Sequence, residues 1–319
     1  MAELKPTRDG FGEGLLELGR TNPSVVALSG DLEDSARAIW FKKAFPARFF
    51  SVGIAEQDMI GTAAGLALMG KIPFACSFSQ FVTGKALEQM RLAVCYQRLN
   101  VKIAGSHGGL SVGADGATAE SLEELTVLRS LPHMTVVVPC DALEAKKAAI
   151  AAAAYPGPVF LRLGRAPTPI ITKPEDPFTI GRANVLRDGG DISLIACGIM
   201  VAHALAAAEF LAKDGISARV INLHTIKPID RATLLAAARD TGAIVTAEEH
   251  SVVGGLGSAV AEVLVQEHPV PMRFVGVMDR FGTSGDPAEL LKAFHLMPED
   301  IAKAAKDVLR LKSAVGSRL

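Results

Sequence analysis

The alternation of short apolar runs with longer helical segments constrains the fold of this chain most. Strands are expected at residues 25–28, 49–53, 73–78, 101–105, 134–138 and 159–163, and helices at 11–18, 56–69, 83–95 and 142–154. Strands that alternate with helices of about 10–15 residues predict a mainly parallel sheet that helices cover on both faces. The predicted fold class is therefore α/β.

The alternation breaks between Gly164 and Gly181, where four prolines occur with no period. A second alternating unit follows from Ile192 to Val277, and two further helices are expected at 287–294 and 298–311. A length of 319 residues suits two domains. We predict two open, doubly wound domains at residues 1–166 and 181–319, joined by a linker at 167–180.

Charge and hydropathy exclude several function classes. The net charge is -1 and there is no basic run, so the sequence predicts neither nucleic acid nor an anionic membrane as a partner. The N-terminus lacks the apolar core of a signal peptide, and no stretch reaches the ~18 apolar residues of a membrane span. The expected location is cytoplasmic. The four cysteines are far apart and form no Cys-x-x-Cys pair, so buried reduced thiols are expected.

Glu56 lies where the apolar run 49–53 meets a helical segment, in the predicted first turn of that helix. Such a junction faces the crevice in which α/β sheets bind ligands. An acidic residue in a first turn also complements the helix dipole, so the junction alone favours a structural role.

A glycine-rich loop at residues 105–116 is the second candidate, with the sequence Gly-Ser-His-Gly-Gly-Leu-Ser-Val-Gly-Ala-Asp-Gly. It starts where the strand 101–105 ends, and its five glycines let the backbone pass close to a ligand. His107 and Asp115 lie inside it. A lone loop histidine or an Asp before Gly is usually structural. His107 and Asp115 follow the end of one strand and Glu56 follows the end of another. Taken together, these three residues indicate a functional site.

A dinucleotide site is the first alternative to test in a chain with two α/β domains. Residues 255–260, Gly-Leu-Gly-Ser-Ala-Val, have Val where the third glycine is required. They also follow Glu248-Glu249-His250, which we interpret as a polar turn rather than a strand. A packing turn is therefore predicted there, and the sequence contains no Walker-type phosphate loop.

The segment Gly53-Ile54-Ala55-Glu56-Gln57, the aromatic residues Phe78 and Phe81 and the glycine-rich loop together resemble the C-terminal half of transketolases. The resemblance extends from about Thr7 to about Arg310. It implies that the chain uses thiamine diphosphate and that Glu56 hydrogen-bonds a ring nitrogen of the cofactor's pyrimidine. That role requires a carboxyl group shielded from water. The cofactor supplies an electron sink while a carbon–carbon bond breaks.

The resemblance also implies roles for other residues. Phe78 and Phe81 match the aromatic pocket around the pyrimidine, with Phe81 as the stacking ring, and Asp31 matches an acid near the linker region of the cofactor. The remaining matches concern the sugar substrate. Arg8, Ser35 and Arg165 match residues that bind its phosphate, and Asp115 matches one that contacts its hydroxyl groups. His107 matches a residue at the mouth of the site and is a further catalytic candidate. The planar fork of arginine gives two hydrogen bonds to phosphate oxygens.

The chain departs from the family pattern at Ala119. Many transketolases have His at this position, and some have Gln, in contact with the sugar or the cofactor. An alanine side chain forms no hydrogen bonds. Either a neighbour such as Glu120 compensates, or the donor is an unusual ketose, for example a branched or sulfonated one.

The Gly-Asp-Gly…Asn motif with which the family holds Mg²⁺ on the diphosphate is absent from the sequence. The resemblance therefore implies one subunit of a split transketolase, paired with a diphosphate-binding N-terminal subunit that supplies the Mg²⁺ site, in a heterotetramer with two chains of each kind. The expected reaction transfers a two-carbon ketol unit from a ketose phosphate to an aldose, as in the pentose phosphate pathway.

Three alternatives stay open. The first is the β subunit of a 2-oxoacid dehydrogenase's decarboxylating component, although its corresponding loop ends in a His-Ser-Gln cluster that this chain lacks. The second is a deoxyxylulose-phosphate synthase, which carries a further N-terminal domain on the same chain. The third is a non-catalytic interaction protein that keeps the fold.

Overall fold

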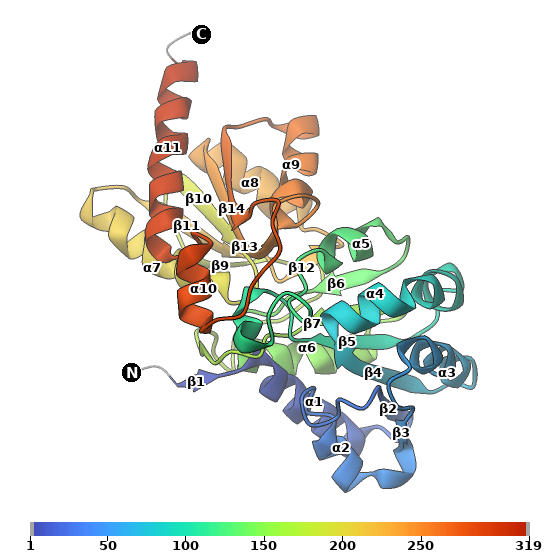
Figure 1. The fold of residues 1–319 in the computed structure, drawn as a ribbon. Coiled ribbons are helices and arrows are strands. Elements are labelled where there is room, and N and C mark those ends of the chain that lie inside the picture. Colours follow the sequence, from blue (N-terminus) through green and yellow to red (C-terminus); the bar gives the residue numbers. More distant parts are fainter. Residues whose placement is uncertain (1–2, 317–319) are drawn as a thin grey trace.

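The computed structural model describes residues 3–316, and seven of its strands form the first large sheet (Figure 1). The strand order is β12-β6-β7-β5-β4-β2-β3. The bounds are β2 Val25–Ser29, β3 Phe49–Ser51, β4 Ile72–Phe78, β5 Lys102–Ser106, β6 Thr135–Val137, β7 Val159–Arg162 and β12 Thr225–Lys227. All neighbours are parallel except β12, which is antiparallel to β6. Strands β2, β5 and β7 are buried throughout, which explains the apolar run of β2; β5 and β7 also bury the charged residues Lys102 and Arg162.

Helices cover both faces of this sheet. Helices α1 (Thr7–Thr21) and α6 (Ala142–Ala154) pack on one face, so closely that a Cβ at Gly10 would lie 1.7 Å from the Ala142 carbonyl oxygen. The opposite face is covered by α3 (Glu56–Leu68), α4 (Ser79–Gln89), the π-helical segment η2 (Met90–Tyr96) and α5 (Glu124–Ser130). Two short helices, α2 (Ile39–Ala44) and η1 (Pro46–Arg48), connect β2 to β3.

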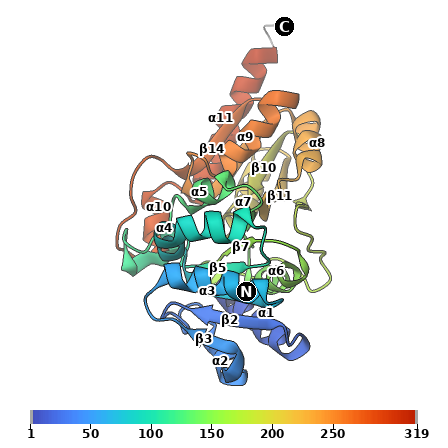
Figure 2. The same ribbon diagram turned by 90° about the vertical axis from the view of Figure 1, so that its right-hand side faces the viewer.

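A five-stranded sheet forms the second half of the chain, in the order β14-β13-β10-β11-β9. Its strands are β9 Asn184–Arg187, β10 Ile192–Ala196, β11 Ala218–Asn222, β13 Ile244–Ser251 and β14 Met272–Val277. Its helices are α7 (Met200–Lys213) and α11 (Pro298–Gly316) on one face, α8 (Arg231–Thr241) and α9 (Leu256–Glu267) on the other, and the short α10 (Pro287–Ala293). Figure 2 shows the two sheets with their helices, so the doubly wound α/β prediction is confirmed.

The two halves share strands and core. Strand β12 belongs to the second half of the sequence, yet it completes the first sheet. One hydrophobic cluster contains Ile103 and Phe160 of the first sheet together with Ile195 and Ile221 of the second. At the start of the predicted linker, β8 (Thr168–Pro169) pairs with β1 (Leu4–Lys5). The halves are therefore joined by backbone hydrogen bonds and by a continuous core.

Several local predictions need correction. The helix expected at 83–95 starts at Ser79, and its last part, η2, is π-helical. Residues 248–250, interpreted as a polar turn, are buried in β13. Burial is possible because a backbone N–H group donates to each of the three side chains and the Arg162 guanidinium group lies 3.8 Å from the Glu249 carboxylate. The four cysteines are free and buried, as expected. Between residues 3 and 316, no helix combines the length and the apolar character that crossing a membrane requires.

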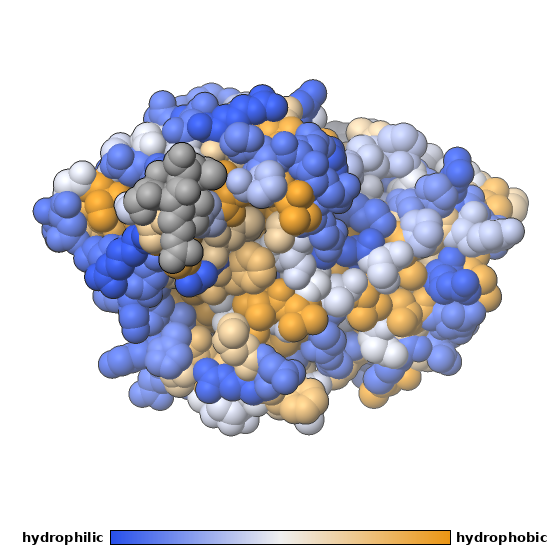
Figure 3. Space-filling model, turned by 90° about the horizontal axis from the view of Figure 1, so that it is seen from above, coloured by the Kyte–Doolittle hydropathy of each residue, from blue (hydrophilic) through white to orange (hydrophobic). Residues whose placement is uncertain are grey.

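The surface of the second half carries hydrophobic patches between charged regions (Figure 3). An apolar groove of about 480 Å³ runs along α9 and the edge strand β14. Its lining includes Val265 and Met278, whose exposed fractions are 68% and 65%, and the partly exposed Phe274.

Candidate active site

The predicted site residues gather at the carboxyl ends of the parallel strands. Asp31 follows β2, Glu56 follows β3, Phe78 ends β4 and His107 follows β5. Because these strands are neighbours in the sheet, their ends meet along one edge. Arg8, in the first turn of α1, is brought to the same edge because its backbone N–H donates to the carbonyl of Gly164, just after β7.

Glu56 is the first residue of α3 and is 2% exposed. The Ser77 hydroxyl donates to its Oε1 at 3.3 Å, and the Lys85 ammonium donates to its Oε2 at 3.3 Å. A left-handed turn at Gly53, with φ of +72°, reverses the chain between β3 and α3. The structure thus places the carboxylate out of solvent, as the sequence interpretation requires.

Three aromatic rings form a stack beside Glu56. Phe78 lies between the other two, with ring centroids 3.8 Å from His107 and 5.2 Å from Phe81. The Lys85 ammonium lies 4.8 Å from the centroid of Phe81. A continuous chain of contacts therefore leads from Glu56 through Lys85 and the rings to the glycine-rich loop. Phe78 is 8% exposed, whereas Phe81 is partly exposed, so Phe81 is the phenyl ring with more accessible surface.

His107 is surrounded by positive charge. The residue is 2% exposed, and its Nδ1 lies 2.8 Å from the Ser106 hydroxyl. Burial, reinforced by the charges of Arg8, Arg165 and Arg37, lowers the pKa of His107 to about 3, so the imidazole is neutral at pH 7. Burial and the nearby Arg37 also lower the pKa of Arg8.

The guanidinium groups are only partly neutralised by the chain itself. Arg37 donates to Asp9 at 2.6 Å, and Arg165 donates to Asp115 at 3.2 Å. Arg8 donates only to a backbone oxygen, that of Ser35, at 3.1 Å, and its buried Nε has no acceptor within the described residues. A group of cations with an unused donor favours an anionic ligand.

Two predicted positions behave differently from this group. Asp31 is exposed in the turn after β2, with φ of +66°, and belongs neither to the ring stack nor to the guanidinium group. Ala119 is 5% exposed and packs against Phe78 and Val112 in a small apolar cluster.

The side chain of Glu120 turns toward the second half of the chain. A Cβ at Gly282 would lie 1.8 Å from its Oε2, and neither carboxyl oxygen has a hydrogen-bond partner among residues 3–316. This orientation disfavours Glu120 as a substitute for the missing histidine.

Sequence reasoning missed Lys85, Ser77 and Arg37. Lys85 follows Phe81 by four residues, which places both on one side of α4, but the helix was expected to start too late to include Phe81. Arg37 has φ of +61°, a conformation that the sequence did not indicate. Within residues 3–316, no three His, Cys, Asp or Glu side chains converge into a metal site.

Two family profiles match nearly the whole chain. Residues 4–169 match the transketolase pyrimidine-binding domain, and residues 181–301 match the transketolase C-terminal domain. The chain belongs to the transketolase family. The predicted family is thus confirmed, and the cofactor of this family is thiamine diphosphate.

Similar proteins include separate subunits of transketolases. The chain is 45% identical over 306 residues to the 6-deoxy-6-sulfo-D-fructose transketolase subunit of Clostridium sp. (strain MSTE9), covering 96% of this chain and 95% of that one. It is 42% identical to one subunit of the apulose-4-phosphate transketolase of Phocaeicola vulgatus, covering 95% and 97%. A solved split-gene transketolase, in an inactive β4 tetramer, superposes with a TM-score of 0.91 at 48% identity, covering 96% and 99%. This transketolase chain therefore resembles separately encoded or named transketolase subunits over about 95% of its length.

Proposed function

We propose that this chain is the pyrimidine-binding subunit of a two-component transketolase, which transfers a two-carbon ketol unit from a ketose phosphate to an aldose. The observation that carries the proposal is the line of contacts from the buried carboxylate of Glu56, through the ring stack, to His107 and the guanidinium groups. This line offers one place for a pyrimidine and, next to it, one place for a phosphorylated sugar.

Glu56 would hold a proton at the ring nitrogen of the pyrimidine. The family's cofactor, thiamine diphosphate, supplies an electron sink when bound. A buried carboxylate fits a nitrogen heterocycle because it can share a proton that water does not compete for. Ser77 and Lys85 fix the orientation of the carboxylate, and the exposed part of the Phe81 ring is a surface on which the pyrimidine can stack.

Arg8 and Arg165 would bind the phosphate of the sugar, next to Ser35. The unused Nε of Arg8 and the repulsion between neighbouring guanidinium groups support an anion there. Neutral His107 can accept a hydrogen bond from a sugar hydroxyl or donate one, and Asp115, held by Arg165, is available to the other hydroxyl groups. Asp31 would approach the cofactor from the turn after β2.

A partner subunit would cover this edge of the sheet and supply the diphosphate and Mg²⁺ site. Large apolar side chains surround the start and end of α3, with exposed fractions of 75% for Ile54, 64% for Leu68 and 81% for Met69. Between them, Gly61 and Gly65 leave open space on the helix. Such a surface next to a buried acid suits a packed neighbour. We propose a heterotetramer with two chains of each kind.

A ketose other than the usual donors is the second candidate, and Ala119 favours it. The alanine leaves an apolar wall of Phe78 and Val112 where many transketolases present a hydrogen-bonding group. Relatives named for a sulfonated ketose and for apulose 4-phosphate support a donor of unusual structure.

The experiment is reconstitution. The chain is mixed with the product of a neighbouring gene that carries the Gly-Asp-Gly…Asn motif, and ketol transfer is measured with thiamine diphosphate, Mg²⁺ and a panel of ketose phosphates. We expect activity from the mixture and none from either chain. Full activity of this chain alone would refute the shared site. Turnover of pyruvate with an artificial electron acceptor would instead support the 2-oxoacid dehydrogenase alternative.

A further inference from the structure

A buried charged cluster joins the two halves of the chain next to the glycine-rich loop. It contains Arg162 at the end of β7, Glu124 at the start of α5 and Glu249 in β13, with exposed fractions of 4%, 0% and 3%. The Arg162 Nε pairs with the Glu124 carboxylate. Arg162 also donates to the backbone oxygen of Glu249 at 3.0 Å, and its Nη1 lies 3.8 Å from the Glu249 Oε1.

The second carboxyl oxygen of Glu249 reaches across to the loop. It accepts a hydrogen bond from the backbone N–H of Ser111 at 3.1 Å. Ser111 belongs to the 3₁₀ segment η3 (Leu110–Asp115). The next residue, Val112, accepts a hydrogen bond from Arg165 through its carbonyl oxygen at 2.7 Å. Glu249 and Arg165 therefore hold the backbone of two consecutive residues of one short segment, Glu249 from the second half of the chain and Arg165 from the first.

Two of the loop glycines are required by this contact. A Cβ at Gly109, whose φ is +90°, would lie 2.3 Å from the Glu249 Cδ. A Cβ at Gly108 would lie 2.8 Å from the Arg162 Nε. The glycines at 108 and 109 therefore let the loop backbone lie directly on the charged cluster, whereas the sequence suggested that they approach a ligand.

We infer that Glu249 is a positioning residue that fixes the sugar-binding loop, and with it His107 and Asp115, from the second domain. The inference rests on the proposed function for the identity of the substrate. A charged acceptor that is buried and paired holds a backbone N–H more firmly than water does. The cluster in turn fixes the Glu249 carboxylate, because Arg162 forms a hydrogen bond with the backbone oxygen of Glu249 and an ion pair with its side chain.

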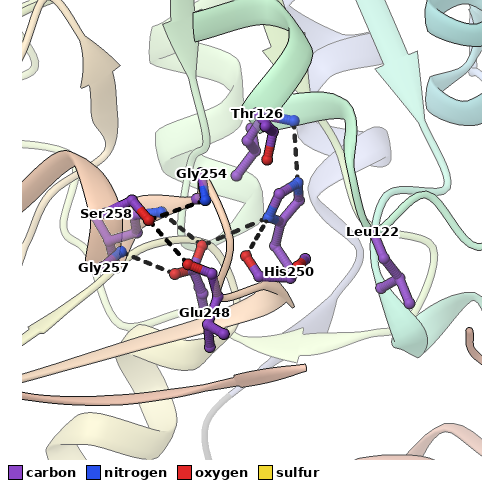
Figure 4. Close-up of polar contacts among 12 residues, drawn as sticks. Leu122, Thr126, Glu248, His250, Gly254, Gly257 and Ser258 are labelled. Carbon is purple, nitrogen blue, oxygen red and sulfur yellow. Dashed lines mark hydrogen bonds and ion pairs between the residues drawn. The ribbon is translucent and has the colours of Figure 1, made fainter. Parts of the chain in front are cut away.

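Glu248 provides a matched control. It is the preceding residue and is 1% exposed, and it also accepts hydrogen bonds from backbone N–H groups. Its donors are Leu256 at 2.6 Å and Gly257 at 2.9 Å, in the first turn of α9. Figure 4 shows its carboxylate directed at that helix, while His250 points toward the segment that includes Thr126. Glu248 is thus about as buried as Glu249, and its hydrogen bonds and ion pair among residues 3–316 are formed with Leu256, Gly257 and His250, outside the loop.

The test compares Glu249→Gln with Glu248→Gln in the reconstituted enzyme. In Glu249→Gln, the side-chain amide places an N–H donor against Arg162 and loosens the loop. We expect the KM for the phosphorylated sugar to rise about tenfold, which corresponds to the loss of roughly one charge-assisted hydrogen bond. The affinity for thiamine diphosphate should stay within about twofold of the wild-type value. Glu248→Gln should lower the melting temperature and leave the KM unchanged. Gly109→Ala, which displaces Glu249 from the loop side, should reproduce the KM effect.

Hydrogen exchange of this chain alone gives a readout that needs no partner and no substrate. Peptides that contain Ser111 should exchange about tenfold faster in Glu249→Gln than in the wild type, and at the wild-type rate in Glu248→Gln. Unchanged exchange and unchanged KM in Glu249→Gln would overturn the inference, and so would equal KM effects in both glutamine variants. A wild-type mixture without ketol transfer would instead count against the proposed function and leave the exchange result standing.

Discussion

The Glu120 carboxyl group provides a direct test of the electrostatics next to the site. Its two oxygens lack hydrogen-bond partners within the described residues, and the side chain is 3% exposed. Burial, together with the charges of Glu249 and Asp115, raises the pKa of Glu120 from 4.5 to about 7. Glu120→Gln replaces this group with a neutral side chain of the same shape.

The sign of the effect follows from proton linkage. In the unfolded chain Glu120 loses its proton near pH 4.5, whereas in the folded chain it keeps the proton until about pH 7. Within this window the free energy of unfolding falls as the pH rises, because ionisation favours the unfolded chain. Above pH 7 the full penalty applies, at most about 3 kcal/mol for this shift. Divided by the unfolding entropy expected for a chain of this length, this penalty corresponds to a decrease of about 4 °C in melting temperature.

The assay is thermal unfolding of the wild type and Glu120→Gln at pH 5 and pH 8. We expect nearly equal melting temperatures at pH 5 and a gain of about 4 °C for the variant at pH 8. Glu88→Gln, an exposed glutamate of α4 in an ion pair with Arg91, serves as the control and should show no such pH dependence. A difference between wild type and Glu120→Gln that is the same at both pH values would refute the reasoning.

Three further predictions concern the proposed reaction. Glu56→Gln should reduce ketol transfer at least about a hundredfold, since the residue would no longer share a proton with the cofactor. Circular dichroism should show that the variant is still folded. A variant with wild-type rates would contradict the proposed role of Glu56. Arg8→Ala should raise the KM of phosphorylated sugars by about tenfold or more and leave that of unphosphorylated ones unchanged, as steady-state kinetics would reveal. Ala119→His should shift the ratio of rates toward unbranched ketose phosphates in a donor panel, and an unchanged ratio would argue against Ala119 as a specificity residue.

The sequence predicted those features that depend on local periodicity and on strand order. The positions of Glu56, Phe78 and His107 could be inferred because each lies where an apolar run ends, and parallel strands bring such ends together. Phe81 was assigned to the pyrimidine pocket together with Glu56 only through the family resemblance. Lys85, one turn further along α4, was missed, because the start of this helix was placed four residues late.

The contacts between distant segments could not be inferred in the same way. Glu249 pairs with Arg162 and Ser111, which lie 87 and 138 residues away in the chain. Three polar residues in a row, at 248–250, favour a turn by composition, because a buried strand of this kind is stable only when partners supplied by other elements satisfy every charge. No pattern within the strand reveals those partners.

Strand β12 limits how the molecule can move. It belongs to the second half of the chain and completes the first sheet beside β6. A rotation of one half against the other would therefore break the backbone hydrogen bonds between β12 and β6. Opening by a hinge between the two halves carries the cost of breaking this pairing. Under the proposed function, movement of surface loops or of the neighbouring subunit would therefore admit and enclose a sugar at lower cost than separation of the two halves.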